Sequence, residues 1–241
     1  KNAIGLDMGG TSTDVSLAYD GQNRVTKDWY IEYGYPIRFP SIEVLTIGAG
    51  GGSMATIDAG GMLQVGPQSS GAVPGPACYN RGGEQFCLTD AILLLGLLDP
   101  GAELPGGIVL DPDLSRAASA PLCERLGLSA VELSERVYRI AAANMAQALR
   151  RVSVKRGLDP RRYALFACGG AGPLIAAAVA DEVDIAEVLI PPNPGVFSAV
   201  GLSLSNVKMD YVLAEGAQAV AAMTPEILKT KLSTLRMEAA R

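Results

Sequence analysis

Apolar and polar residues alternate at the start of the chain, which predicts β-strands. Ile4 and Leu6 alternate with smaller or polar residues, and Val15 and Leu17 resume the alternation after a short polar stretch. Asp20-Gly21 is a strong turn signal that follows this second run. The pattern therefore predicts three successive strands, at 2–7, 13–19 and 23–33.

Helical spacing of apolar residues dominates the second half of the chain. Ser129 and Glu132 form a capping box, after which apolar residues recur at helical spacing up to Gly157. A helix of this length is roughly 40 Å long. The pattern then predicts a buried strand from Tyr163 to Cys168, a helix at 173–182, a strand at 188–190 and a last helix that starts at Thr224-Pro225. Three strands followed by helix–strand alternation predict an α/β fold of the ribonuclease-H-like type.

The middle of the chain, residues 36–128, is rich in Gly and Pro and is interpreted as an insertion within this fold. Its apolar pieces predict short strands at 43–47, 54–58 and 62–65 and one helix near 89–98. Thr89 is the expected cap of that helix, and Asp90 suits its first turn. We therefore expect one lobe over residues 1–212, with 36–128 inserted in it, followed by a C-terminal helical segment at 213–241. The start at Lys1 and the helical end suggest a fragment of a longer protein.

Composition narrows the possible functions. The 241 residues are 49% hydrophobic, which is enough for one large domain, and the net charge is −5 without a long basic tract. These features argue against a nucleic-acid partner. The sequence has no run of 18 apolar residues and no signal peptide, so we expect a cytoplasmic protein with no membrane segment. The absence of His and of any CxxC pair argues against a zinc site and favours buried free thiols at the four cysteines.

The polar stretch between the first two strands is the first candidate site. It begins with Asp7, continues through the glycines and hydroxyl residues Gly9, Gly10, Thr11, Ser12 and Thr13, and ends at Asp14. Paired glycines leave backbone N–H groups bare for a phosphate, and an acid at a strand end can hold Mg²⁺ directly or through water. The alternative is an ordinary hairpin with a Gly- and Thr-rich turn.

Two further glycine-rich turns are candidates. Gly169, Gly170, Ala171 and Gly172 lie between a predicted strand and helix, where they could lie flat against a base or ribose. The alternative is tight strand–helix packing, which also demands small residues. Gly50, Gly51 and Gly52 belong to the loop GAGGGS at 48–53, which suits either a substrate or phosphate contact or an exposed hinge. Glu43 and Asp58 flank that loop as possible acids.

A basic cluster lies near the end of the long predicted helix. Its members are Arg150, Arg151, Lys155, Arg156, Arg161 and Arg162. Cations are favoured at a helix C-terminus, so a solvated face is the preferred interpretation, ahead of a phosphate clamp.

Several of these segments resemble a known family. DMGGTSTDV at the first turn is similar to a phosphate loop of the actin/sugar-kinase/Hsp70 ATPase superfamily, and more closely to the hydantoinase A, 5-oxoprolinase and acetone carboxylase family. Five further segments match that family in order over residues 1–212: EVLTIGAGGGSMA, GPQSSGAVPGPACYNRGG, LTDAILLLG, RGLDPRRYALFACGGAGPL and IPPNPGVFSAVGL. The resemblance implies one lobe of an ATPase that closes two similar lobes over a nucleotide.

The resemblance also implies chemistry. Asp7 and Asp14 become the candidate catalytic acids, with Asp7 holding Mg²⁺ or positioning the attacking water. Residues 9–13 would bind phosphate and residues 169–172 adenosine, while residues 50–52 would lie near the active centre. The implied activity is an ATP-dependent cyclic-amide hydrolase that phosphorylates an amide or enol oxygen. Its partners would be an N-terminal lobe of the same protein and a hydantoinase B-type subunit, and the isolated chain would hydrolyse little ATP.

Two alternatives to this activity stay open. One is a subunit of an ATP-dependent ketone carboxylase, and the other is a non-catalytic nucleotide-binding or structural subunit. The chain departs from the family pattern at Ile175, where many members have His. Ile cannot move protons or bind a metal, so acid–base work would fall to other groups and the substrate range would differ.

Overall fold

A central mixed sheet organises the protein. A computed structural model describes residues 2–27, 29–30, 32–37, 40–101, 103–104, 106–207, 209, 211 and 223–240. Among these residues, the sheet has the order β14-β13-β1-β2-β3, with β8 also paired to β2. Its strands are β1 (Ala3–Met8), β2 (Thr13–Tyr19), β3 (Gln22–Asn23), β8 (Val44–Ile47), β13 (Ala164–Cys168) and β14 (Val188–Leu189).

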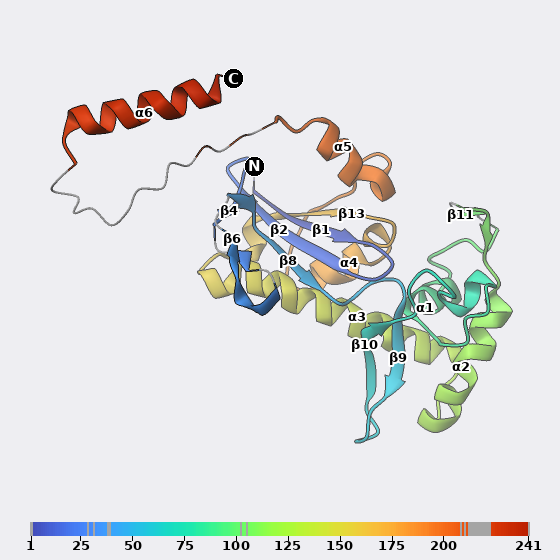
Figure 1. Ribbon diagram of the computed structural model, residues 1–241. Helices are drawn as coiled ribbons and strands as arrows, with labels where there is room; N and C mark the ends of the chain where they lie inside the picture. The colour runs from blue at the N-terminus through green and yellow to red at the C-terminus, as the bar shows by residue number, and fades with distance from the viewer. Residues whose placement is uncertain are drawn as a thin grey trace.

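Strand directions confirm the predicted ribonuclease-H-like fold. β1 runs antiparallel to β2 and parallel to β13, and β13 runs parallel to β14. Alternate residues of β1 are buried, because one face of the sheet packs against α3 (Ala130–Val152) and α4 (Gly172–Glu182). Figure 1 shows α3 below the sheet and α5 (Phe197–Ser203) above it. The sheet is therefore the middle layer, and its strand ends at β1 and β13 lie side by side.

The third predicted strand and the predicted insertion differ from the structure. Residues 23–33 do not form one strand but contribute to β3, β4 (Val25–Thr26) and β5 (Trp29–Tyr30), the last two pairing with β7 (Ser41–Ile42) and β6 (Pro36–Ile37). Because β3 covers only Ala18 and Tyr19 of β2, the rest of that edge is open and β8 pairs there. The strand predicted at 43–47 thus belongs to the central sheet rather than to an insertion.

The remaining elements before α3 form a small subregion beside the sheet. They are the hairpin β9 (Ser53–Ile57) and β10 (Leu63–Ser69), α1 (Leu88–Leu94), the hairpin β11 (Glu103–Leu104) and β12 (Ile108–Val109), and α2 (Pro112–Leu126). The sequence pattern did not predict α2, which has Pro121 inside it and buries only Ser115 and Ser119 completely. The predicted cap of α1 was also wrong, since Cys87 takes the cap position and Thr89 lies inside the helix.

Most predicted helices are confirmed within a few residues. Ser129 and Glu132 make the capping box of α3, which ends at Val152 before a 3₁₀ turn that stops at Gly157. The sequence did not predict α5. Further 3₁₀ turns lie at Glu32–Gly34, Ala77–Tyr79, Pro160–Arg162 and Pro194–Val196. The C-terminal α6 (Pro225–Ala239) is capped by Thr224, as expected, while residues 213–222 and 241 of the predicted C-terminal segment lie outside the described residues.

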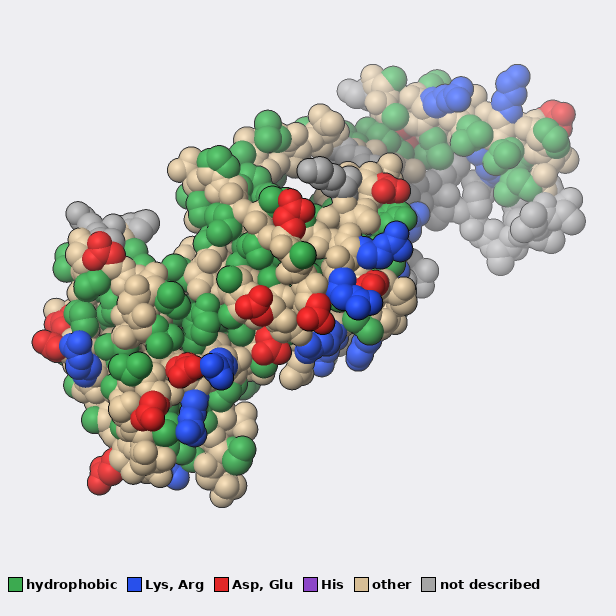
Figure 2. Space-filling model, turned by 180° about the vertical axis from the view of Figure 1, so that it is seen from behind, with side chains coloured by type: hydrophobic (Ala, Val, Ile, Leu, Met, Phe, Trp, Pro, Cys, Tyr) green, Lys and Arg blue, Asp and Glu red, His purple; other side chains and the backbone are tan. Residues whose placement is uncertain are grey.

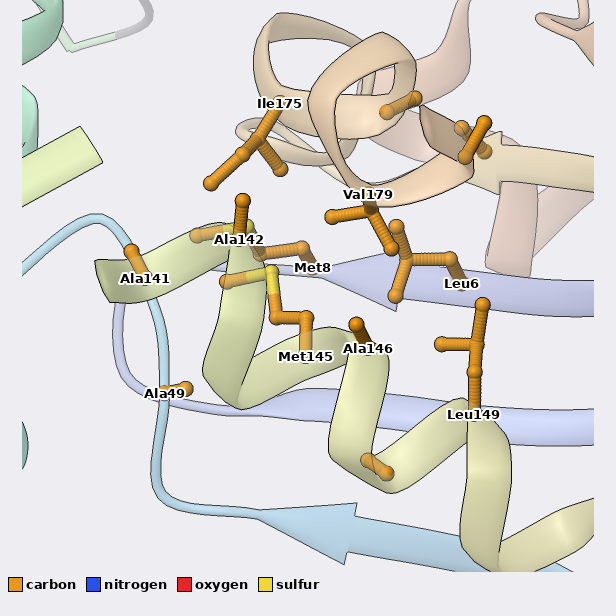
Figure 3. Packing of buried hydrophobic residues seen from close by; sticks show 14 of the residues in the cluster. Leu6, Met8, Ala49, Ala141, Ala142, Met145, Ala146, Leu149, Ile175 and Val179 are labelled. Atoms are coloured by element: carbon orange, nitrogen blue, oxygen red, sulfur yellow. The ribbon is translucent and has the colours of Figure 1, made fainter. Parts of the chain in front are cut away.

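Small side chains on α3 bring it close to both β1 and α4. Figure 3 shows the small Ala142 and Ala146 of α3 in one cluster with Met145 and Leu149 of the same helix and with Leu6 and Met8 of β1. Ile175 and Val179 of α4 complete this cluster, and Ile175 is fully buried. The alanines let the backbones approach, so larger residues from the neighbouring elements fill the space between them. No helix in the described part of the chain combines the length and apolar character needed to cross a membrane.

A buried carboxylate fixes the start of α1. Asp90 is completely buried, and its two oxygens accept hydrogen bonds from the N–H groups of Cys78 (2.8 Å) and Cys87 (2.9 Å) and from the hydroxyl of Ser115 (2.8 Å). These donors come from three separate segments. Asp90 therefore ties the segment around Cys78, α1 and α2 together, and it holds the neighbouring Thr89 in place.

Replacing Asp90 by Ala should destabilise the protein by about 3 kcal/mol or more, because each buried donor left without an acceptor costs roughly 1–3 kcal/mol. Urea unfolding followed by circular dichroism measures this. Asp113→Ala is the matched control, since Asp113 lies exposed on α2 and pairs only with Arg116. Equal midpoints for the two variants would contradict the anchoring role of Asp90.

Candidate functional site

Two of the three predicted glycine turns meet at one end of the sheet. β1 and β13 are parallel, and Asp7 and Cys168 are directly paired at their carboxyl ends. The turns that follow both strands therefore start at the same edge, and the N–H of Ala171 donates to the carbonyl of Met8 at 3.0 Å. The predicted phosphate loop and the predicted adenosine loop are neighbours in space, as the nucleotide interpretation requires.

The phosphate loop presents free polar groups. The N–H of Gly9 donates to the carbonyl of Ser12 at 3.0 Å, which closes the turn. Within the described part of the chain, the N–H groups of Gly10, Thr11 and Ser12 have no hydrogen-bond acceptor, and Gly10 and Thr11 are exposed. A row of unpaired N–H groups with flanking hydroxyls suits an anion such as phosphate. Thr13 differs from expectation, because it is buried and its hydroxyl donates to the carbonyl of Ala49 at 2.6 Å.

The loop GAGGGS at 48–53, which we call the brace, supports the phosphate loop through backbone hydrogen bonds. The N–H of Gly51 donates to the carbonyl of Gly9 (3.0 Å), and the N–H of Gly52 donates to that of Gly10 (2.6 Å). The carbonyl of Gly51 in turn accepts both the N–H and the hydroxyl of Thr89, each at 2.8 Å. A continuous hydrogen-bond chain therefore runs from α1 through the loop to the phosphate loop.

Close contacts with neighbouring segments explain the three glycines of this brace. A Cβ on Gly50 would lie 2.6 Å from the backbone nitrogen of Thr11, and one on Gly52 would lie 2.9 Å from the hydroxyl oxygen of Ser69. A Cβ on Gly51 would lie 2.8 Å from the hydroxyl oxygen of Thr89. All three glycines are buried, so the loop is not the exposed hinge that the sequence left open. Gly51 alone of the three also borders a pocket.

That pocket, of about 240 Å³, gathers residues of all three glycine turns. Gly10, Gly51 and Gly170 form one side of it. The other side is apolar and comes from the subregion beside the sheet and from α4: Tyr79, Ile92, Leu98, Leu104, Ile108 and Leu174. An apolar wall that faces free N–H groups suits a ligand with one flat apolar part and one anionic part.

Tyr79 and Thr89 supply the polar groups of the apolar side. Burial raises the pKa of the Tyr79 phenol, and a hydrogen bond with the Thr89 side chain opposes that rise. The phenol therefore stays protonated at neutral pH and remains a hydrogen-bond donor. The ring lies against Gly75, where a Cβ would approach it to 2.9 Å.

Asp7 does not line this pocket; it lies near the end of β1, on the sheet face opposite α3. The hydroxyl of Ser198 in α5 donates to Asp7 Oδ2, and the Cys168 thiol lies beside the same carboxylate. Burial, followed by the charge of Asp7, raises the pKa of Cys168 to about 11, so the thiol is protonated. Asp14 is paired with Asp7 across β1 and β2, is exposed and accepts the hydroxyl of Thr46 at 2.6 Å.

The four residues of the second glycine turn divide by role. Gly169 has a positive φ of 82° and lies against Asp7, where a Cβ would be 2.5 Å from Oδ1. A Cβ on Gly172 would lie 3.4 Å from the carbonyl oxygen of Leu6. These two positions fit the packing interpretation. Gly170 is different, since an added Cβ there meets nothing within 4 Å, so packing does not explain this glycine and it faces the pocket.

Other candidate residues lie elsewhere. Glu43 pairs with Arg24 (2.8 Å) and with Arg156. Hydrogen bonds from the Met62 N–H, the Gln64 side chain and the Gly60 N–H hold the pKa of Asp58 below its usual value. Neither acid lines the pocket, and neither does the basic cluster. On the face that Figure 2 shows, Lys and Arg side chains lie mixed with Asp and Glu, which agrees with a solvated surface.

The position at which the family pattern has His is part of the core here. Ile175 is fully buried between α4 and α3, and it does not line the pocket (Figure 3). Its apolar side chain suits that environment. The described residues contain no group of three or more Asp, Glu, Cys or His side chains that could hold a metal by themselves. Asp7 and its cross-strand neighbour Asp14 therefore offer fewer than three such side chains, which matches Mg²⁺ sites that are completed by water and by phosphate oxygens of a ligand.

Sequence reasoning missed the apolar wall and Ser198. Tyr79 and Ser198 lie in the segments GPACYNRGG and FSAVGL, which resembled the family but carried no recognisable chemistry. Ser198 is 191 residues away from Asp7 in the chain. The positions of Tyr79 in the pocket wall and of Ser198 beside Asp7 can be recognised only once it is known which elements are adjacent.

Comparison with known proteins agrees with these motifs. Residues 1–211 match the family model described as hydantoinase/oxoprolinase. The chain is 42% identical to caprolactamase subunit alpha of Pseudomonas jessenii over 88% of its own length and 30% of that protein. It is 36% identical to 5-oxoprolinase 1 of Arabidopsis thaliana, over 87% of this chain and 18% of that protein. It is 34% identical to the acetophenone carboxylase gamma subunit of Aromatoleum aromaticum, over 88% of this chain and 29% of that protein. The chain therefore spans less than a third of the length of these relatives.

Solved structures show the same arrangement. The crystal structure of the ATP-dependent caprolactamase from Pseudomonas jessenii matches with a TM-score of 0.78 and 37% identity, over 100% of this chain and 35% of that chain. A nucleotide-free acetone carboxylase structure matches with a TM-score of 0.75 and 29% identity, over 83% of this chain and 28% of that one. The α/β fold described above is therefore shared with both enzymes.

The two adjacent glycines of the second turn should respond differently to Ala. Gly169→Ala should lower stability by about 1–3 kcal/mol, because a side chain is strained at positive φ and this one collides with the Met8 carbonyl and with Asp7. Gly170→Ala should change stability by less than about 1 kcal/mol, since its Cβ enters open space. Thermal unfolding of both variants tests the division of roles, and an equal loss at the two positions would refute it.

Proposed function

Because this chain belongs to the hydantoinase/oxoprolinase family, we propose that it forms the nucleotide-binding lobe of an ATP-dependent enzyme that opens cyclic amides. The observation that carries the proposal is the pocket where all three glycine turns meet, with free N–H groups on one side and an apolar wall on the other. The relatives named above include an ATP-dependent caprolactamase and a 5-oxoprolinase, and both names describe enzymes of cyclic amides.

The residues present fit Mg·ATP. The N–H groups of Gly10, Thr11 and Ser12 would receive phosphate oxygens, and Asp7 would hold Mg²⁺ through its carboxylate or through water. The adenosine would lie along residues 169–172, with its base against Gly170 and the apolar wall. Bound Mg·ATP supplies a phosphoryl group that turns an amide oxygen into a leaving group.

The protein's contribution to this chemistry is positioning and charge neutralisation. The brace of residues 50–52 keeps the phosphate loop rigid, so that its N–H groups do not reorganise when charge develops at the phosphoryl group. Asp7 precedes the phosphate loop and lies against Gly169 of the second glycine turn, and we assign it to Mg²⁺ or to the attacking water. Asp14, one strand away on the same sheet face, is the second acid of the site.

A carboxylase is the second candidate. The similarity to the acetophenone carboxylase gamma subunit and to acetone carboxylase favours it, and the same lobe would then activate a ketone enol oxygen. Both activities use the phosphate loop and the pocket alike. Two incubations of the complete protein with Mg·ATP distinguish the two activities by their products. One contains a panel of hydantoins, lactams and 5-oxoproline, and the other contains ketones and bicarbonate. If the protein consumes no ATP with either panel, the non-catalytic subunit is favoured.

We further propose that the lobe works with partners in the cytoplasm. The names of two relatives describe subunits, so a second, hydantoinase B-type subunit and a second phosphate-binding lobe are the partners that we expect. The four cysteines are free thiols, a state that a reducing compartment maintains. On this basis the 241 residues alone should show little ATP turnover.

Asp7→Asn in the complete protein should lower ATP-dependent turnover by about two orders of magnitude, because the charge that faces Mg²⁺ or the water is lost. The substitution preserves the shape of the side chain, so the melting temperature should stay close to that of the wild type. Steady-state kinetics measure the effect, with Asp113→Asn on the exposed face of α2 as control. Unchanged turnover in Asp7→Asn would mean that the turn after β1 is an ordinary hairpin.

Gly170→Val should weaken nucleotide binding without lowering stability, because its side chain would project into the pocket instead of into the protein. The measurement is the rise in melting temperature on addition of Mg·ATP, which should shrink or vanish in the variant. Gly201→Val on α5 is the control, since a Cβ there also meets open space but lies outside the pocket. A wild-type shift in Gly170→Val would argue that no ligand lies against this turn.

A further inference from the structure

A helix from the far end of the chain holds the Asp7 carboxylate. The hydroxyl of Ser198, in the first turn of α5, donates to Asp7 Oδ2, although the two residues are 191 positions apart. On the other side of the carboxylate, Oδ1 lies against Gly169, which has no side chain to displace it. The Cys168 thiol also lies beside this carboxylate.

The position of α5 is fixed independently of Ser198. The ring of Phe197 packs on that of Phe166 in β13, with centroids 5.1 Å apart and the rings tilted by 49°. Just before the helix, the carbonyl of Pro194 accepts the N–H of Gly169 at 2.9 Å. The first turn of α5 is thus attached to β13 and to the second glycine turn by contacts that do not involve the Ser198 hydroxyl. These contacts aim the hydroxyl at Asp7 and make its hydrogen bond unnecessary for holding the helix.

We propose that Ser198 is a positioning residue that fixes the orientation of Asp7 for phosphoryl transfer, with the Cys168 thiol as a supporting contact. This inference rests on the proposed function of the site. A free aspartate side chain at a strand end samples several rotamers, whereas a donor on one oxygen and a close backbone on the other select one. The selected orientation keeps the carboxylate beside the two glycine turns.

The thiol fits this arrangement as a weak donor. Cys168 is paired with Asp7 across β13 and β1, and its thiol lies beside the carboxylate. Ser198 is the stronger of the two contacts, because a hydroxyl donates a better hydrogen bond than a thiol. The larger effect on catalysis should therefore come from Ser198.

Kinetics of the complete protein test the proposal. Ser198→Ala should lower kcat about tenfold, the effect expected when a hydrogen bond to a charged group is lost. The KM for ATP should stay within about twofold of the wild type, since the phosphate and base contacts remain. The melting temperature should stay within about 2 °C, since the Phe197 packing remains. Ser198→Thr, which keeps the hydroxyl, should restore most of kcat. Ser203→Ala is the matched control, because the Ser203 hydroxyl donates only to the Val200 carbonyl of its own helix.

A double-variant cycle separates this inference from the proposed function. If Ser198 acts through Asp7, adding Ser198→Ala to Asp7→Asn should cause no further loss of kcat. An additive loss, or a wild-type kcat in Ser198→Ala while Asp7→Asn is inactive, overturns the positioning role and leaves the proposed function standing. Full activity in Asp7→Asn itself would instead refute the proposed function. A loss of kcat that is matched by a loss of melting temperature would show that the serine is merely structural.

Discussion

The site depends on one backbone-to-backbone contact, in which the loop GAGGGS is hydrogen-bonded to the phosphate loop. The N–H groups of Gly51 and Gly52 in this loop donate hydrogen bonds to the carbonyls of Gly9 and Gly10. These bonds occupy the carbonyls of Gly9 and Gly10, and the N–H groups of residues 10–12 have no acceptor among the described residues. Without the brace, the turn would be free to use those N–H groups in its own local bonds, and the anion cradle would be lost.

The brace is itself held by buried polar groups of the subregion beside the sheet. Thr89 binds the Gly51 carbonyl twice, and Asp90, next to it in α1, ties α1 to two other segments. The subregion therefore has two functions in this structure. Its polar groups fix the phosphate loop, and its apolar side chains form the wall of the pocket. A change in the wall could alter ligand preference while the polar anchor preserves the geometry of the turns.

The glycines of this protein are required for different structural reasons, even where two of them are adjacent in the chain. Gly50 is needed because the backbone of the phosphate loop comes close, and Gly52 because the hydroxyls of Ser69 and Ser70 do. Gly169 is needed because its φ is positive and Met8 and Asp7 lie beside it, whereas Gly170 borders the pocket. A glycine motif in the sequence cannot separate these reasons. The added-Cβ geometry can: a Cβ on Gly10 or Gly170, which border the pocket, would meet open space, whereas a Cβ on Gly50 or Gly169 would collide with a neighbouring segment.

The sequence by itself determined the local elements and the candidate chemistry. Alternation gave β1 and β2, the capping box gave the start of α3, and the order of strands and helices gave the ribonuclease-H-like fold, because each depends on residues close in the chain. It also marked Asp7 and the three glycine turns. Only the tertiary structure decided that β8 completes the sheet, that Thr13 and Thr89 brace loops instead of binding ligand or capping a helix, and that Ile175 is a core residue. It also placed Ser198 on Asp7. These features depend on contacts between distant segments, and no periodicity in a single sequence records which segments meet.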